Sequence, residues 1–150
     1  MQSIALELES IIDRHLSQLQ SIPESKLIYK PSPIKWSKKE IVGHMVDSAQ
    51  NNIRRFVVAQ YEENPTIVYN QDKWVVVSNY QHYDLSALIR LWYLLNKHIV
   101  AILKNTSAEM AQRKCQTEDS HTLEWIAKDY INHLLHHVHQ VLELESVAYP

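Results

Sequence analysis

The sequence has 150 residues, of which 45% are hydrophobic and 21% charged, and its formal net charge at pH 7 is −2. This length predicts one domain, residues 1–150, with a continuous core. The small net charge gives no electrostatic reason to expect a nucleic acid or an anionic membrane as a partner. Cys115 is the single cysteine, so an intrachain disulfide is excluded and a reducing, cytoplasmic location is expected. Acidic residues near the first methionine disfavour a signal peptide, and no apolar run is expected to span a membrane.

Helical periodicity is the main structural signal. Four segments carry apolar residues at helical spacing, from about Ser3 to Leu19, from Ser37 to about Gln60, from Asp84 to about Asn105 and from near Thr122 to about Glu145. The chain has a single glycine, and this also favours helices because all-β folds need glycine in turns and bulges. The sequence therefore predicts an all-α four-helix bundle.

The connection between the second and third helices, Tyr61 to Tyr83, is long and lacks helical rhythm. Connections of this length in compact domains are usually functional or carry structure of their own. Within it, Val75–Val77 is equally compatible with a short buried segment and with an edge segment. Ahead of the second helix, Ser37 and Glu40 have the spacing of a capping box.

Four of the nine histidines lie between His133 and His139 on the last predicted helix. At about 100° per residue, His137 falls about 40° from His133, beside the apolar arc. His136 and His139 fall among the polar residues, and we expect their loss to leave metal binding intact. A pair spaced i, i+4 can share a metal ion, although hydrogen-bonded histidines at the edge of a core are the simpler alternative.

A mononuclear catalytic site generally needs three protein ligands and an open position. The second helix offers His44, which aligns at helical spacing with Asn51 and Arg55 in a polar stripe that could equally be solvated surface. The only glycine, Gly43, directly precedes it and costs the helix ~1 kcal/mol relative to alanine. A glycine inside a helix often marks the close approach of another group, such as a backbone or a ligand.

Three stretches, WSKKEIVGHMVDSAQNNIRRF, YNQDKW and DYINHLLHHVHQV, resemble the DinB-like superfamily and, within it, the YfiT-like branch of metal-dependent hydrolases. They share a Trp–Ser/Thr start of the second helix, a histidine followed three residues later by aspartate, an Asp-Lys-Trp segment and a closing H-x-x-H-H. The resemblance implies a four-helix bundle, often a homodimer, that binds one zinc or nickel ion per chain through His44, His133 and His137. Relatives in the superfamily include transferases and isomerases that act with low-molecular-weight thiols, which implies a small-molecule substrate.

Such a centre would hold Zn²⁺ or Ni²⁺ with a water that attacks an electrophile or is replaced by a thiol, and the sequence does not choose between the two. Asp47, Glu40 and Asp129 are candidate bases or carboxylates that orient the ligands, with solvated charges or capping groups as the alternative. A hydrolase or thiol-dependent transferase is the first functional hypothesis. The alternative is a non-catalytic binding module that contains a metal. A fourth protein ligand to the metal would favour this alternative, because structural zinc sites are closed by four protein ligands.

Candidate substrate contacts come from the second helix and the long connection. Arg55 and Asn51 lie on the stripe of His44, and Arg55 would bind an anionic group unless it forms a surface salt bridge. Trp74 would form a wall of the pocket unless it is buried in the core. Cys115 is expected in a polar, flexible stretch without a redox role.

Overall fold

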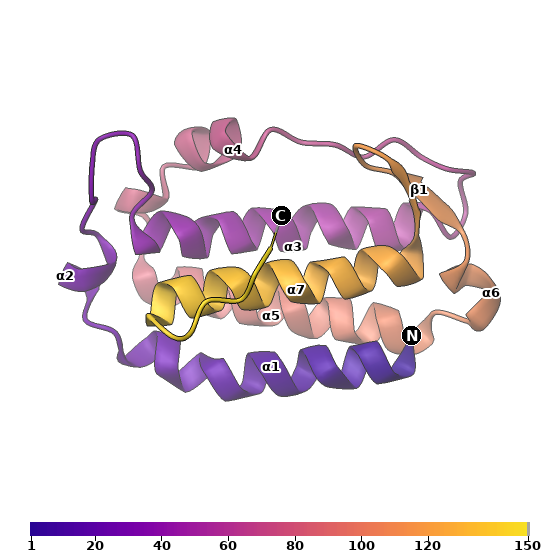
Figure 1. The fold of residues 1–150 in the computed structure, drawn as a ribbon, viewed down its shortest axis with the longest axis horizontal. Coiled ribbons are helices and arrows are strands. Elements are labelled where there is room, and N and C mark those ends of the chain that lie inside the picture. Colours follow the sequence, from indigo (N-terminus) through magenta and orange to yellow (C-terminus); the bar gives the residue numbers. More distant parts are fainter. Residues whose placement is uncertain (150) are drawn as a thin grey trace.

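Four long helices lie side by side along the molecule (Figure 1). The computed structural model describes residues 1–149. The long helices are α1 (Gln2–Ser21), α3 (Lys38–Val58), α5 (Leu85–Asn105) and α7 (Leu123–Leu142). Both α1 and α3 pack against α5 and against α7, so consecutive long helices α1 and α3 lie diagonally across the bundle. The predicted four-helix bundle is confirmed.

The connection between α3 and α5 returns along the whole bundle, so that α3 and α5 run in the same direction (Figure 1). Although its sequence lacks helical rhythm, the connection has structure of its own, helix α4 (Gln71–Ser78) and a 3₁₀ turn, η1 (Tyr80–His82). Only Val75 of α4 is buried, whereas the next two valines are exposed. A short helix with one buried residue has no apolar stripe, which is why periodicity did not reveal it.

A small β-hairpin between α5 and α7 was also missed. After the short helix α6 (Ala108–Ala111), strands β1 (Lys114–Gln116) and β2 (Ser120–Thr122) pair antiparallel. Cys115 is fully buried here, so the expected flexible stretch was wrong. The backbone of Gln116 bonds to Pro65 and Ile67, which ties the hairpin to the long connection.

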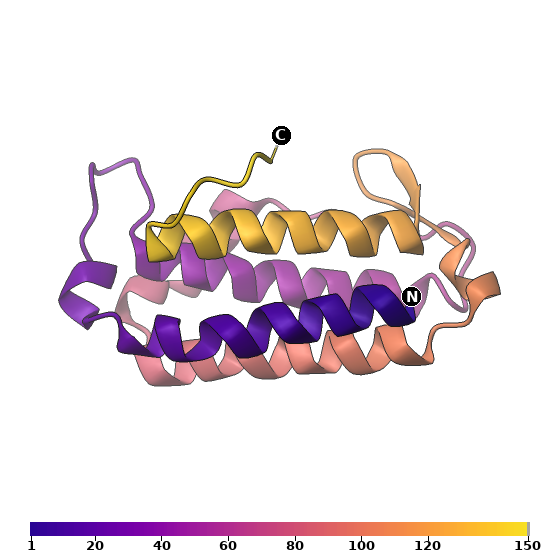
Figure 2. The ribbon, with the colours of Figure 1, turned by 60° about the horizontal axis from the view of Figure 1, so that its bottom comes forward.

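The last helix ends earlier than predicted, at Leu142, because Glu143 adopts a left-handed conformation with φ of 58°. The chain then turns and runs back over the outer face of α7 (Figure 2).

Among the described helices, α5 alone is long and apolar enough to cross a membrane, so the expectation that no apolar run reaches that length was wrong by length and composition. In this fold α5 packs against α1 and α3. Its outer side carries exposed polar residues, Arg90, His98 and Lys104. The helix is thus amphipathic and serves as a core helix of the bundle.

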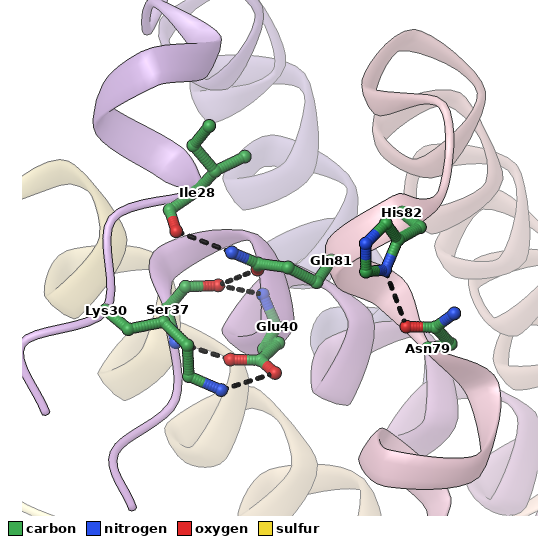
Figure 3. A network of polar contacts seen from close by, with 7 residues as sticks. All are labelled: Ile28, Lys30, Ser37, Glu40, Asn79, Gln81 and His82. Carbon is green, nitrogen blue, oxygen red and sulfur yellow. Dashed lines mark hydrogen bonds and ion pairs between the residues drawn. The ribbon is translucent and has the colours of Figure 1, made fainter. Parts of the chain in front are cut away.

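Side-chain caps fix the start of α3. Ser37 accepts from the Glu40 amide at 3.1 Å, and the Glu40 carboxylate accepts from the Ser37 amide at 2.7 Å, which is the predicted capping box. Ser37 also donates to Gln81 of η1, which in turn donates to the Ile28 carbonyl (Figure 3). The loop before α3 and the turn before α5 are therefore joined at Ser37, the residue just before α3, about two helical turns before His44.

Candidate metal centre

Three histidines converge between α3 and α7. His44 projects from α3, and His133 and His137 project from successive turns of α7. The Nε2 atoms of His44 and His133 are 3.0 Å apart, and one ligand atom from each of the three rings lies within 4.8 Å of the others. The structure thus brings together the three residues predicted as ligands.

Burial keeps these imidazoles uncharged. His44 is 1% exposed, and burial lowers its pKa to about 3. Burial, reinforced by the neighbouring histidines, lowers the pKa of His133 to about 2 and also lowers that of His137. Uncharged imidazoles have a free lone pair, so the group is prepared to bind a cation at neutral pH without first losing protons.

The donor set and its spacing fit a divalent metal. Two imidazole nitrogens at 2.0–2.1 Å from a tetrahedral zinc lie about 3.3 Å apart, close to the 3.0 Å between His44 and His133. His137 donates its Nδ1 proton to Gln140 Oε1 at 3.1 Å, which leaves the Nε2 lone pair free for a ligand bond. Within residues 1–149, no further histidine, cysteine or carboxylate belongs to the group. The three side chains therefore form an incomplete coordination shell, as a site with an open position requires.

Two cavities flank the centre. The first, of about 730 Å³, has His133, Ser48, Arg55 and Asp129 in its wall. The second, of about 720 Å³, is lined by His137 and by the loop before α3. Both volumes suit a small organic molecule.

Asp47, predicted as a base or an orienting carboxylate, lines neither cavity. It is fully buried and accepts a hydrogen bond from the Tyr80 hydroxyl, while its Oδ2 has no partner among the described residues. Burial raises its pKa to about 6, and the bond from Tyr80 only partly offsets this. Tyr80 reaches Asp47 by crossing α3 at Gly43, where an added Cβ would lie 2.1 Å from the ring. The close approach that the glycine predicted is made by this tyrosine.

The two other candidate carboxylates have different surroundings. Glu40 belongs to the capping box and forms an ion pair with Lys30 at 2.8 Å, so its role is at the start of α3 (Figure 3). Asp129 lines the first cavity together with His133 and accepts from the Tyr149 hydroxyl at 3.0 Å.

Of the three candidate substrate contacts, Arg55 alone lines one of these two cavities. Its guanidinium donates twice to the Ile67 carbonyl, at 3.2 and 3.1 Å. Asn51 is buried and donates to the backbone of Asp47. Trp74 contacts Tyr69, a wall residue of the first cavity, at 5.5 Å between ring centroids.

Sequence reasoning missed two aromatic neighbours of the centre. Trp36 lies 5.0 Å from the His44 ring, and Tyr149 lies 5.2 Å from the His133 ring, measured between centroids. Trp36 directly precedes the capping box, which is a usable signal. Tyr149 comes from the segment after α7, where no motif marked it.

Comparison with solved structures gives the same fold. The solved structure of YfiT from Bacillus subtilis, described as "a probable metal-dependent hydrolase with an unusual four-helix bundle topology", superimposes with a TM-score of 0.84 at 22% identity. The match covers 95% of this chain and 84% of that one. At this level of identity the likeness shows the fold alone.

Relatives by sequence carry the name "Putative metal-dependent hydrolase". YfiT from Bacillus subtilis is 27% identical over 113 residues, 73% of this chain and 64% of its own. A Bacillus mycoides protein is 32% identical over 78 residues, 44% of this chain and 45% of its own, so the chain spans less than two thirds of either relative. The sequence profile of the DinB superfamily matches residues 7–141. This match includes most of each long helix and all three histidines, and the chain therefore belongs to the DinB superfamily.

Proposed function

We propose that this protein is a metal-dependent enzyme, a hydrolase or a thiol-dependent transferase, whose centre is His44, His133 and His137. The observation that carries the proposal is the convergence of three uncharged imidazoles on one point between α3 and α7. The names of the relatives support metal dependence and hydrolysis.

Zn²⁺ or Ni²⁺ bound to three neutral imidazoles keeps its full positive charge and supplies a water of lowered pKa or a stabilised thiolate. The chain's own contribution is to keep the imidazoles neutral by burial and to orient them. Gln140 fixes the tautomer of His137, and the Trp36 ring packs on His44. A structural zinc would be closed by a fourth protein ligand, and the three-residue group among residues 1–149 favours a reactive site over the binding module.

The first cavity is the proposed substrate site. Arg55 lines it, and no carboxylate in the described part of the chain lies within ion-pair distance of the guanidinium. An unpaired cation inside a cavity is a natural partner for an anionic group of a substrate. Asp129 lines the same cavity as His133, and this supports Asp129, among the candidate carboxylates, as the proposed proton acceptor.

The test is metal analysis of protein purified without a histidine tag. Wild type should contain one zinc or nickel ion per chain, and His133→Ala should contain none. His98→Ala is the matched control, because His98 is exposed on α5 and belongs to no histidine group. Metal content unchanged in His133→Ala would overturn the centre. Metal-loaded protein should then turn over an ester, an amide or a thiol-transfer substrate, and inactivity against all three classes would favour the binding module.

A further inference from the structure

The segment after α7 folds back over the helix that carries two of the three histidines. Glu143 adopts φ of 58°, a conformation that side-chain-bearing residues rarely take. The reversal sends residues 144–149 along the outer face of α7 (Figure 2). The backbone amides of Glu143 and Leu144 both donate to the His139 carbonyl and close the end of the helix. Contacts further along the segment hold the rest of it against α7.

Those contacts come from the histidines that have no place in the metal centre. The His136 Nδ1 atom lies 2.7 Å from the Val147 carbonyl oxygen, and the His139 Nδ1 atom lies 2.7 Å from the Glu145 carbonyl oxygen. A carbonyl oxygen only accepts, so both rings donate from Nδ1. The polar side of α7 thus carries two donors that hold one short stretch of backbone.

Tyr149 completes the attachment at the centre itself. Its hydroxyl donates to Asp129 at 3.0 Å, and its ring lies 5.2 Å from the His133 ring and 6.1 Å from the His136 ring. The same ring forms part of the wall of the first cavity. A ligand that approaches His133 from this cavity therefore meets Tyr149.

The segment is attached without being part of the core. Residues 143–146 and 148 are exposed, and Val147 and Tyr149 are only half-buried. Its release would break three side-chain hydrogen bonds, the two ring contacts of Tyr149 and the exposed ion pair between Lys38 and Glu143. The packing of the four long helices would stay unchanged. Segments with few buried apolar contacts open more readily than the rest of a domain.

We propose that residues 143–149 form a strap that controls access to the three-histidine centre, with Tyr149 as the residue that selects which ligands reach it. His136 and His139 hold the strap to α7, and Asp129 holds Tyr149 over His133. The identity of the ligand rests on the proposed function, whereas the covering of His133 does not.

The first experiment measures the rate at which 1,10-phenanthroline extracts zinc from the zinc-loaded protein. Tyr149→Ala should accelerate extraction by about tenfold, equivalent to the loss of about one hydrogen bond and its ring contact, with the zinc stoichiometry unchanged. Tyr149→Phe, which keeps the ring, should show a smaller increase, and His98→Ala should match wild type. A Tyr149→Ala rate within twofold of wild type would overturn the strap.

A second experiment needs no metal and separates the two proposals. Diethyl pyrocarbonate modifies accessible neutral imidazoles, and peptide mass spectrometry reports its reaction with His133 in the metal-free protein. Tyr149→Ala and His136→Ala should both raise this rate. His136→Asn should restore it towards the wild-type value, because the asparagine amide can donate from the position of Nδ1. If wild type binds no zinc but these rates change as stated, the metal centre fails and the strap stands; equal rates in all variants would refute the strap.

Discussion

Gly43→Ala is the substitution that most directly tests the packing behind the centre. In an ordinary exposed helix, this change stabilises the protein by ~1 kcal/mol because glycine is a poor helix former. Here the new Cβ would lie 2.1, 2.2 and 2.6 Å from three carbons of the Tyr80 ring, well inside contact distance. Neither side can yield easily, since Tyr80 is 5% exposed and its hydroxyl bonds to buried Asp47.

The expected change in the free energy of unfolding follows from the packing and the hydrogen bond that the Tyr80 ring would lose. Forcing an extra methyl group into a packed interior costs about 1–3 kcal/mol. If the ring shifts, the Asp47 carboxylate loses its donor, and an unsatisfied buried acceptor costs about 1–3 kcal/mol. After subtraction of the gain in helix propensity, Gly43→Ala should lower the free energy of unfolding by about 1–5 kcal/mol.

Urea denaturation of Gly43→Ala, Tyr80→Ala and the double variant measures this coupling. In the Tyr80→Ala background the ring is gone, so Gly43→Ala should become stabilising by up to ~1 kcal/mol. A change of sign between the two backgrounds is the expected result. If Gly43→Ala stabilises the protein that retains Tyr80, the Tyr80 ring is not the reason for a glycine at position 43.

Further predictions concern ionisable groups. The metal-free protein should lose stability as the pH falls below 6.5, because the unfolded chain protonates histidines that burial keeps neutral in the fold, His133 with a pKa of about 2 among them. In urea titrations between pH 6.5 and 5, the free energy of unfolding of His133→Asn should fall less steeply with pH than that of wild type. Equal slopes in the two proteins would contradict a buried, neutral His133 ring. Asp47 acts in the opposite direction: its pKa is raised from 3.8 to about 6, so its contribution is full below pH 3.8 and is lost as the pH rises through 6. Asp47→Asn should lack this contribution of about 3 kcal/mol, and its stability relative to wild type should be lowest in acid. Burial also raises the pKa of Cys115, so Ellman's reagent should label that thiol in urea but not in the folded protein; rapid labelling without urea would contradict its burial.

The sequence was informative wherever one residue type had one dominant physical role. Ser37, Asp84 and Thr122 were predicted to begin helices, and each side chain accepts from a backbone amide of the first turn. Helical projection separated His137 from His136 on α7, because its buried face carries a continuous apolar arc. In each case the information is local, within one or two turns of a helix.

The missed features depend on contacts between distant segments. Helix α4 has a single buried residue, so its stability comes from the surfaces it covers and leaves no periodic pattern. Cys115 has polar neighbours in the sequence, yet the hairpin packs it beneath the long connection, where its Sγ atom lies 3.2 Å from the Pro65 carbonyl oxygen. Tyr149 was missed for the same reason. The left-handed turn at Glu143 directs the chain back towards His133, and no residue near Glu143 in the sequence indicates such a turn.

The direction of the helices decides whether the three histidines can meet at all. His44 lies six residues after the start of α3, ~9 Å along its axis. His133 and His137 lie nine and five residues before the end of α7, ~13.5 and ~7.5 Å from it. Because α3 and α7 run in opposite directions (Figure 1), the start of α3 lies beside the end of α7. Along the bundle axis, His44 therefore falls between His137 and His133.

A short hairpin connection between α3 and α5 would reverse this arrangement. It would make α5 antiparallel to α3, and α7, which follows antiparallel to α5, would then run parallel to α3. His137 lies fourteen residues after the start of α7, ~21 Å along it, and would be ~12 Å beyond the height of His44. The long connection returns the chain to the first end of the bundle before α5 begins, and in doing so it brings the histidine of α3 level with those of α7. The convergence of the three histidines therefore requires a long connection, although the histidines themselves all lie on other elements.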